Sequence, residues 1–358
     1  MIKILCITNS YPIHPRLRKI GNTFLGFEKT TQVKYFAWDR NNIGESSEED
    51  IVFSTNIGYN NNLLKLKEIR YFEKAYLDFV KIYKPHIVIA RFWDMAFLAS
   101  KHKDKYGYHL IYDINDMPLT DNILKDTIYK YFERKALKKA DCILLSSRFY
   151  EELYKKYLFK TYIIENYPEK SILKVYNNKK ERFTLSFIGG VSYYETAKNL
   201  CDAAKEMDMD VKFFGAGKEN NKLDEYCQRN KIKNVEFYGI YNYPDIYKFY
   251  HMSDLIWAAY PYINKNVQFS ISNKFFESLL FEKLGVFSIN TKSGEYIEKN
   301  NIGFTVDPYS VEKIKELLKD ILTNASLLEK RTQNIKKHKK YTWNENIPKL
   351  EKIFKSMT

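Results

Sequence analysis

The sequence has no apolar run close to the roughly 20 residues that a transmembrane helix requires, so we expect no membrane-spanning segment. Its four cysteines, Cys6, Cys142, Cys201 and Cys227, have no spacing typical of a metal or redox motif, and its six histidines form no cluster. We therefore expect no metal site, and core positions for Cys6 and Cys142 in a reducing cytoplasm. No zinc-finger or RNA-recognition signature is present, so nucleic acid is not an expected partner.

Acidic residues are fewer than basic ones, 44 against 58, which gives a formal net charge of +14. This excess favours an acidic partner, either an anionic membrane surface or a nucleotide diphosphate. A hydrophobic fraction of 45% and an aromatic fraction of 16% exclude a disordered chain. At 358 residues the chain is longer than one ordinary core, which predicts two domains.

Predicted strands and helices alternate along the whole chain, which is typical of parallel sheets with helical crossovers. The first half has strands at 2–8, 33–37, 86–90, 110–113 and 142–146, and helices that include 16–27, 63–83 and 148–157. Between them, an acidic and Asn-rich stretch at 41–62 has no predicted element. The second half has strands at 183–188, 211–214, 235–238, 255–258, 286–289 and 304–306, and its helices include 273–283 and 310–340. We predict an α/β fold with two Rossmann-like domains.

The most informative stretch runs from residue 268 to residue 308. Ser270 to Asn273 is a polar lead-in with good N-capping residues. An apolar stripe of Phe275, Phe276, Leu279 and Leu280 then predicts a helix that ends at Gly285. Lys274 and Glu277 are three residues apart on the opposite face, in the first turn, where free N–H groups and the helix dipole favour an anion. The alternative is a surface Lys–Glu pair on a helix that covers a sheet.

Several loops follow predicted strands, where ligands of parallel sheets bind. In the second half these loops contain Gly189-Gly190 with Ser192, Gly215-Ala-Gly217, and Tyr238-Gly239. Paired glycines allow backbone N–H groups to approach a phosphate, although an ordinary strand–helix turn has the same residues. Asp208-Met-Asp210 matches the metal-binding motif Asp-x-Asp, but it precedes its strand and so lies at the other edge of the sheet. We therefore assign no metal to it.

Three loops of the first half also follow predicted strands. They contain His14 and Arg16, then Arg91, Trp93 and Asp94, and finally Asp116. These side chains offer cations, a stacking plane and carboxylates to a ligand. For Arg16 the alternative is a Pro-restricted loop that caps a helix, and for Asp116 it is a helix cap after Pro118.

The run Asn273-Lys274-x-x-Glu277, continued to Gly285, resembles the donor-site helix of glycosyltransferases with the GT-B fold, notably family 4. Ser272 stands where that family usually has proline, and Phe269 where it has a first glutamate. The resemblance implies that Glu277 binds the ribose hydroxyls of a nucleotide sugar and that Lys274 meets its diphosphate. The other residues implied at the donor are Gly189, Gly190, Ser192, Lys198, Gly215, Tyr238, Gly239, Ser272 and Asn273.

The same resemblance implies two facing Rossmann-like domains. Residues 1–168 would hold the acceptor and 169–340 the donor, and a helix within 341–358 would pack back on the first domain. The residues implied at the acceptor are His14, Arg16, Arg91, Trp93 and Asp94. The implied enzyme is a hexosyltransferase that retains the anomeric configuration and uses a UDP-sugar as substrate, with no cofactor and no metal. An inverting relative would need a base, for which Asp116 is the first choice and Asp94 the second.

The implied acceptor is a glycan or lipid-linked glycan of bacterial capsule, O-antigen (lipopolysaccharide) or exopolysaccharide assembly. With the net charge and basic patches around Lys65–Arg70 and Lys138–Lys139, this predicts a cytoplasmic protein at the inner face of the bacterial membrane. Two alternatives stay open: a GT-B sugar-nucleotide epimerase with the same donor helix, and a non-enzymatic basic protein that binds membrane surfaces.

Overall fold

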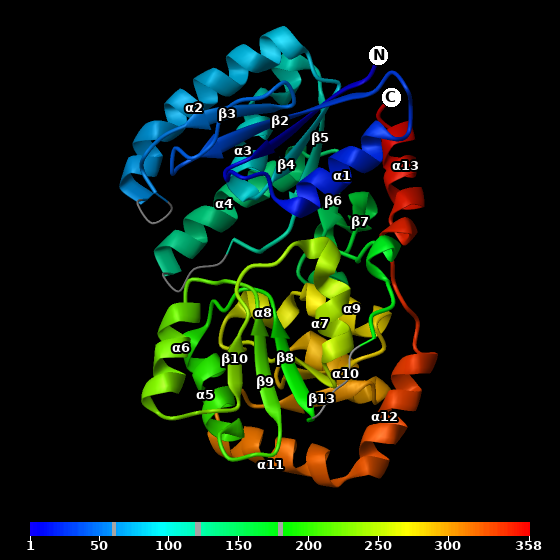
Figure 1. Ribbon diagram of the computed structural model, residues 1–358. Helices are drawn as coiled ribbons and strands as arrows, with labels where there is room; N and C mark the ends of the chain where they lie inside the picture. The colour runs from blue at the N-terminus through cyan, green and yellow to red at the C-terminus, as the bar shows by residue number, and fades with distance from the viewer. Residues whose placement is uncertain (59–61, 119–122, 178–181) are drawn as a thin grey trace. The chain divides into compact units, whose positions relative to one another are not determined.

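The computed structural model describes residues 1–58, 62–118, 123–177 and 182–358 (Figure 1). The chain forms two compact units, one made of Met1–Glu165 with Glu345–Thr358 and the other of Asn166–Asn344. Each unit has one parallel sheet with helices on both faces, as the alternating pattern predicts. Within these described ranges, no helix is long and apolar enough to cross a membrane.

The sheet of unit 1 has seven strands in the order β3-β2-β1-β4-β5-β6-β7, and every neighbouring pair is parallel. These strands are β1 (Lys3–Thr8), β2 (Gln32–Asp39), β3 (Asp50–Ser54), β4 (Ile87–Arg91), β5 (His109–Ile114), β6 (Cys142–Leu145) and β7 (Thr161–Ile163). All five residues of the central strand β4 are buried, because helices cover both faces of the sheet.

The helices of unit 1 are α1 (Pro15–Leu25), α2 (Asn62–Tyr83), α3 (Trp93–Tyr106), α4 (Ile123–Lys139) and, from the end of the chain, α13 (Ile347–Lys355). Helix α13 packs on α1 (Figure 1), where the Phe354 ring lies 5.9 Å from Phe24 and 5.6 Å from Phe27. The Asn346 amide donates to the carbonyl of Glu165 over 2.8 Å. The last residues of the chain therefore belong to the core of unit 1.

The sheet of unit 2 has six parallel strands in the order β10-β9-β8-β11-β12-β13. They are β8 (Thr184–Ile188), β9 (Asp210–Phe214), β10 (Val235–Phe237), β11 (Leu255–Ala258), β12 (Leu284–Ser288) and β13 (Gly303–Val306). Its helices are α5 (Tyr194–Ala204), α6 (Asn220–Arg229), α7 (Ile246–Met252), α8 (Lys265–Phe269), α9 (Asn273–Leu280), α10 (Lys292–Asn300), α11 (Val311–Thr323) and α12 (Ala325–Lys337).

In each sheet the strand order reverses direction beside the first strand of the unit. In unit 1 the reversal lies between β1 and β4, and in unit 2 between β8 and β11. The loops after these strands diverge to opposite faces and leave a crevice at the carboxyl ends, which is where ligands of such sheets bind. The loops after β1, β4, β8 and β11 are therefore the first places to look for a site.

Four sequence predictions need correction. The stretch 41–62 contains β3, which pairs with β2. Residues 148–157 form short 3-10 helices, Arg148–Glu152 and Lys155–Lys160, instead of one helix. The predicted helix 310–340 is broken at Asn324, whose side chain accepts from Leu327 N and so caps the second segment.

The fourth correction concerns the end of the helix that starts at Asn273. Helix α9 ends at Leu280, and Gly285 lies inside β12. Glu282 takes the left-handed conformation at φ +56, and Lys283 N donates to Ser278 O over 2.9 Å. A glutamate therefore occupies the helix-ending position that glycine commonly takes.

Candidate active site

Two glycine loops of unit 2 pack backbone against backbone at the carboxyl ends of β8 and β9. Gly189 has φ +129 and Gly215 has φ +120, a region that favours glycine. A Cβ atom on Gly215 would lie 2.7 Å from the carbonyl carbon of Gly189, so no larger residue fits there without a shift. Gly189 N donates to Phe214 O over 2.6 Å, and Gly215 N donates to Gly239 O over 2.8 Å. The loops form one rigid backbone platform.

Asn220, the first residue of α6, locks this platform with its side chain. Its Oδ1 accepts from Gly217 N over 2.7 Å and from Val191 N over 3.2 Å, and its Nδ2 donates to Gly215 O over 2.8 Å. The residue is buried. In the sequence, Asn220 stands where a Gly-x-Gly-x-x-Gly motif would have its third glycine, so the departure from that motif has a structural role.

Lys274 brings a positive charge to the same platform. Its Nζ donates to the Tyr260 hydroxyl over 2.6 Å and lies 4.3 Å from the centre of the Phe187 ring. A Cβ atom on Gly189 would be 3.2 Å from this Nζ, so the ammonium group lies directly against the glycine loop. A cation and a rigid turn rich in backbone N–H groups together suit a phosphate or diphosphate.

Glu277, one turn further along α9, is buried and holds two tyrosines. Oε1 accepts from the Tyr243 hydroxyl over 2.9 Å, and Oε2 accepts from the Tyr250 hydroxyl over 2.8 Å. Burial first, and then the charge of Glu277, raise the pKa of both tyrosines, so both donate as neutral phenols. A carboxylate has about four acceptor positions, so it can accept from more than two donors at once.

The burial of α9 excludes one alternative. Every residue from Lys274 to Leu280 is buried, with 7% of Lys274 and 3% of Glu277 exposed. The two side chains therefore are not a surface ion pair on a sheet-covering helix. Both are directed into the protein, which costs free energy for a charge and is typical of functional positions.

The other residues expected at the donor have different surroundings. Ser272 is the N-cap of α9, but its side chain makes no capping hydrogen bond. Asn273 Oδ1 accepts from Asn166 over 2.7 Å. Tyr238 is half exposed and packs on Phe214, with 4.6 Å between the ring centres and the rings tilted, next to Gly239 at φ +71.

Ser192 and Lys198 lie beyond the glycine loop, before and within α5. Ser192 is exposed at the end of the loop. Lys198 forms an ion pair with Asp202 over 2.9 Å and lies 4.9 Å from the centre of the Tyr226 ring on α6. The hydrogen bond with Asp202 raises the pKa of Lys198. In this structure Lys198 is engaged with Asp202 and Tyr226, and its role at the phosphates stays a prediction.

In unit 1, Arg16 has a structural position. It is fully buried, its Nε and Nη2 donate to Asp113, with the shortest distance 2.8 Å, and its Nη1 donates to Ile164 O over 2.6 Å. These bonds join the start of α1 to β5 and to the residue after β7. Arg16 thus uses its Nε, Nη1 and Nη2 donors inside the protein, and its contact with an acceptor stays a prediction.

Asp94, at the start of α3, is the centre of a second polar group in unit 1. Its carboxylate accepts from Asn9 over 2.7 Å, from Lys65 over 2.7 Å and from Met95 N over 3.0 Å. Burial would raise the pKa of Asp94, but Lys65 and then Asn9 outweigh it and lower the pKa. Asp94 is thus a paired carboxylate, which does not suit a general base.

Arg91, His14 and Asp116 lie within electrostatic range of one another near the carboxyl edge of the same sheet. Arg91 is buried against the Phe92 ring, and its Nε has no hydrogen-bond partner in the part of the chain that the structure describes. Burial lowers the pKa of Arg91 to about 10 and that of His14 to about 4. Neutral His14 accepts from Arg16 N at Nδ1, which leaves its proton on Nε2.

Asp116 is half-buried, and one of its oxygens accepts from the Asn115 side chain over 2.6 Å. The residue before α3, Phe92, has φ +71, an unusual value for an aromatic residue. Such backbone positions persist where packing enforces them and are concentrated at binding sites. Arg91, His14 and Asp116 thus lie near one another at the carboxyl edge of this sheet, and their role at an acceptor stays a prediction.

Sequence reasoning missed several residues of both sites. They are Asn220, Tyr243, Tyr250, Tyr260 and Phe187 in unit 2, and Asn9 and Lys65 in unit 1. Of these residues, Asn220 could have been identified from the sequence, because it occupies the third glycine position of the motif Gly-x-Gly-x-x-Gly that begins at Gly215. In the described ranges, no three His, Cys, Asp or Glu side chains are placed to hold a metal ion.

Comparison with known proteins agrees with this geometry. The model of the family "Glycosyl transferases group 1" matches residues 169–340, which include both glycine loops and α9. An uncharacterized glycosyltransferase of Methanocaldococcus jannaschii, MJ1178, is 24% identical over 244 residues, which is 66% of this chain and 66% of that protein.

Solved structures share the fold over the full length. Sucrose-phosphate synthase from Thermosynechococcus elongatus has a TM-score of 0.75 at 12% identity, covering 100% of this chain and 99% of that one. HepE from Anabaena, in complex with UDP and glucose, has a TM-score of 0.74 at 12% identity, covering 99% and 100%. At such identities the likeness establishes the fold alone. The chain therefore has the GT-B fold, and its residues 169–340 match the glycosyltransferase family named above.

Proposed function

We propose that the protein transfers a hexosyl group from a nucleotide sugar to an acceptor hydroxyl. Unit 2 binds the donor and unit 1 binds the acceptor. The observation that carries this assignment is the Lys274 ammonium group against Gly189 of the rigid glycine platform, because that combination suits a diphosphate. The uracil nucleotide is our choice of donor, supported by HepE, which has been solved with UDP-glucose.

In the proposed reaction, positioning and charge stabilisation carry the catalysis. The bond between the anomeric carbon and the diphosphate oxygen breaks, and the diphosphate gains negative charge that Lys274 and the loop N–H groups stabilise. Glu277 accepts hydrogen bonds from the ribose hydroxyls. The resemblance to family 4 supports retention of the anomeric configuration, and the proposal assigns no step to a metal ion. If the product is inverted, Asp116 is the base in place of the paired Asp94.

The proposed acceptor is a lipid-linked glycan of bacterial surface-polysaccharide assembly, met at the inner face of the cell membrane. The net charge of +14 supports this, and so does α4, which has six basic and two acidic residues. Each basic group near an anionic leaflet contributes about 1 kcal/mol, so about three suffice for reversible attachment.

Thermal stabilisation by UDP-, GDP- and CMP-sugars tests the donor. A ligand at about 100 times its Kd stabilises the fold by about 2.7 kcal/mol, which raises the melting temperature measurably. We expect stabilisation by UDP-sugars, and transfer to a lipid-linked acceptor with product stereochemistry read by NMR. If none of these nucleotides stabilises the protein, the transferase proposal is wrong. Epimerisation of the donor without any acceptor would identify an epimerase instead.

Sedimentation with liposomes tests the membrane surface. We expect binding to anionic but not to neutral liposomes at low salt, and release near about 0.5 M salt, where the Debye length is roughly 4 Å. Equally weak binding to both kinds of liposome would refute membrane attachment and direct the search to a soluble acceptor.

A further inference from the structure

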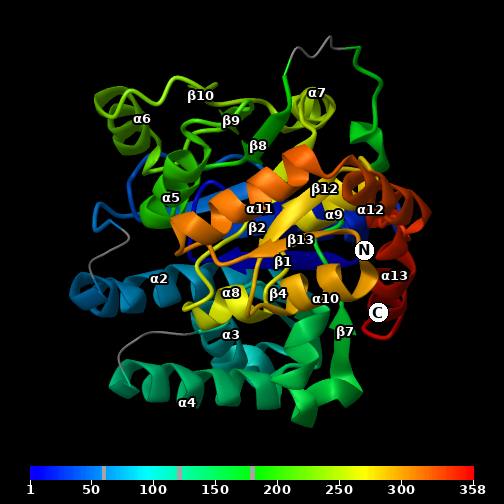
Figure 2. The same cartoon turned by 90° about the horizontal axis from the view of Figure 1, so that it is seen from below.

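An apolar groove lies between α2, α3 and α4 of unit 1, where α3 runs between the other two helices (Figure 2). Its volume is about 380 Å³, within the range of about 300–1,000 Å³ that small-molecule sites occupy. The apolar lining consists of Leu66 and Ile69 from α2, Trp93, Phe97 and Leu98 from α3, and Ile128, Tyr129 and Phe132 from α4. None of these residues has a role in the donor site of unit 2.

Aromatic rings form one wall of the groove. The Trp93 ring lies 4.6 Å from Tyr129, and the Phe97 ring lies 4.6 Å from Phe132. Two aliphatic residues of the lining stay open to solvent, with 70% of Leu66 and 51% of Ile128 exposed. The groove therefore reaches the surface through an apolar mouth, which is unusual unless a partner covers it.

Four of the charged side chains that line the groove form two ion pairs with one another. Lys65 holds Asp94 over 2.7 Å at one place, and Lys101 holds Glu73 over 2.6 Å at another. An apolar chain that enters would therefore not bury any of these four charges unpaired. The paired Asp94 also joins the groove to the acceptor edge, since it lies in both.

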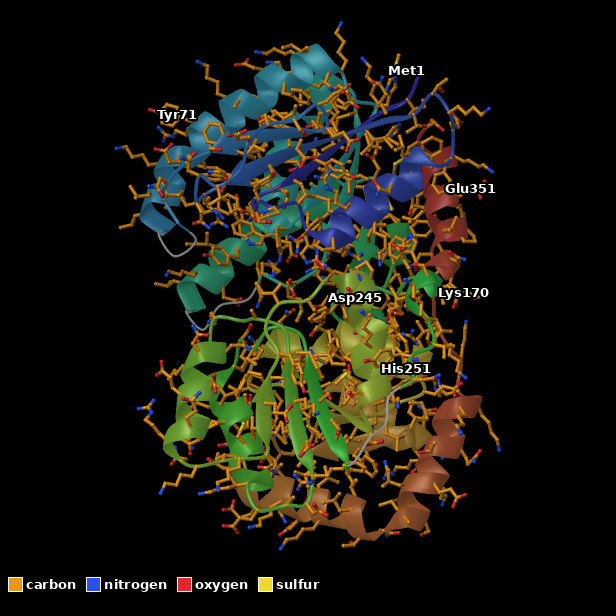
Figure 3. The ribbon with its side chains drawn as sticks, viewed as in Figure 1. Met1, Tyr71, Lys170, Asp245, His251 and Glu351 are labelled. Carbon is orange, nitrogen blue, oxygen red and sulfur yellow. The ribbon has the colours of Figure 1, made fainter. Side chains whose placement is uncertain are left out.

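The surface around the mouth is both apolar and basic. Leu63 and Leu124 are 82% and 76% exposed near the starts of α2 and α4. Tyr71 is also exposed on α2 (Figure 3), but helical periodicity places it on the side of α2 away from Leu66 and Ile69. Lys65, Lys101 and Lys125 belong to the lining itself. An anionic amphiphile matches such a surface in both respects, since its chain is apolar and its head group is negative.

We propose that this groove binds the hydrocarbon chain of an anionic membrane lipid, with the lipid's phosphate at the lysines of the mouth. The chain in question is that of the lipid-linked acceptor, so this inference rests on the proposed function and adds the site that holds the lipid part of the acceptor. A chain held here would place its head group beside Asp94 and Trp93. The glycan on that head group would then lie at the acceptor edge of the sheet.

Trp93 makes the groove directly observable. The protein has four tryptophans, and the other three, Trp38, Trp257 and Trp343, are buried at 0%, 1% and 5% exposure. The probe is 9,10-dibromostearate below its micelle concentration, because bromine quenches tryptophan fluorescence only at short range. We expect saturable quenching in the full-length protein that is absent in Trp93→Phe.

Three variants distinguish binding in the groove from nonspecific binding to exposed apolar residues. Leu66→Glu and Ile128→Glu introduce a charge into the mouth of the groove and should weaken binding of the probe by at least about tenfold. Ile82→Glu is the matched control, since Ile82 is 79% exposed on α2 but does not line the groove, and it should bind like the wild type. All three positions are exposed, so the variants should fold. The neutral methyl ester of the probe should bind more weakly than the acid.

The outcomes are distinguishable from those of the donor test, because quenching needs no nucleotide. Equal quenching in Leu66→Glu, Ile82→Glu and wild type would refute lipid binding in the groove, and so would the absence of quenching in all three. Neither result would bear on the proposed transferase activity. If the probe quenches Trp93 but the protein binds no nucleotide, the groove is a lipid-binding site and the proposed transferase function is refuted. In transfer assays Leu66→Glu should raise KM for a lipid-linked acceptor and leave KM for the nucleotide sugar unchanged. A raised donor KM would count against the inference.

Discussion

Replacing Glu277 by glutamine tests the centre of the donor site. Wild-type Glu277 uses one oxygen for Tyr243 and the other for Tyr250, so the ribose hydroxyls of a nucleotide must share these oxygens. Glutamine keeps the size of the side chain but replaces one acceptor oxygen by an amide donor. One tyrosine keeps its carbonyl acceptor, and the hydroxyl oxygen of the other can accept from the amide, so the fold should survive.

The magnitude follows from the loss of charge. Hydrogen bonds to an ionised acceptor contribute about 1.5–3 kcal/mol, and neutral ones about 0.5–1.5 kcal/mol. Two ribose hydroxyls on a buried carboxylate therefore lose about 1.5–3 kcal/mol in total when that charge is removed. This is a rise in Kd for the nucleotide of about 10- to 100-fold. The cost to folding should stay near about 1 kcal/mol, because the tyrosine hydroxyls retain partners.

Isothermal titration calorimetry with UDP measures this effect, and a denaturant titration checks the fold. Glu295→Gln is the control, since Glu295 is an exposed glutamate on α10 that pairs with Lys292. An unchanged Kd for Glu277→Gln, in a protein that unfolds like the wild type, would refute ribose binding by this residue. It would leave Glu277 as a structural partner of two tyrosines.

Three further changes test other parts of the molecule. Lys274→Met keeps the buried stem but removes the charge, and should lower kcat about 100-fold or more without early melting; a protein that melts early yet turns over normally per folded molecule would show a structural lysine. Asn220→Ala leaves two backbone N–H groups and one carbonyl of the glycine platform without their partner. The free energy of unfolding, measured with denaturant, should fall by about 2–3 kcal/mol, and an unchanged value would contradict the locking role. Glu133 is buried beside Tyr112 and Tyr154, and burial raises its pKa to about 7. The folded state then keeps a proton that the unfolded state loses above pH 4.5, so stability contributed by this group is complete below pH 4.5 and is lost as the pH rises through 7. Glu133→Gln should therefore gain up to about 3 kcal/mol over the wild type at pH 8 and nothing at pH 4, and an equal effect at both values would contradict the buried charge.

The predicted alternation of strands and helices was confirmed because the signal is local. A parallel strand buried on both faces is a short continuous apolar run, and β4 and β12 show it directly. The strand β3 escaped prediction because it is the edge strand and only partly buried, so its apolar content does not stand out from the loop around it. The end of α9 escaped because Glu282 takes a conformation that its residue type rarely adopts.

The sequence by itself determined the α/β class, the helix that begins at Asn273 and the glycines of the loops after β8 and β9, since each depends on neighbours within a few residues. Only the tertiary structure decided which side chains remain for a ligand. Arg16 looks like a binding residue until β5 brings Asp113 to it from 97 positions away. Likewise Glu277 meets Tyr243 and Tyr250 only because the 3-10 helix Tyr243–Asp245 and the following α7 bring these hydroxyls to α9. The partners of these buried charges come from segments far apart in the sequence, so a local sequence pattern cannot predict the pairs.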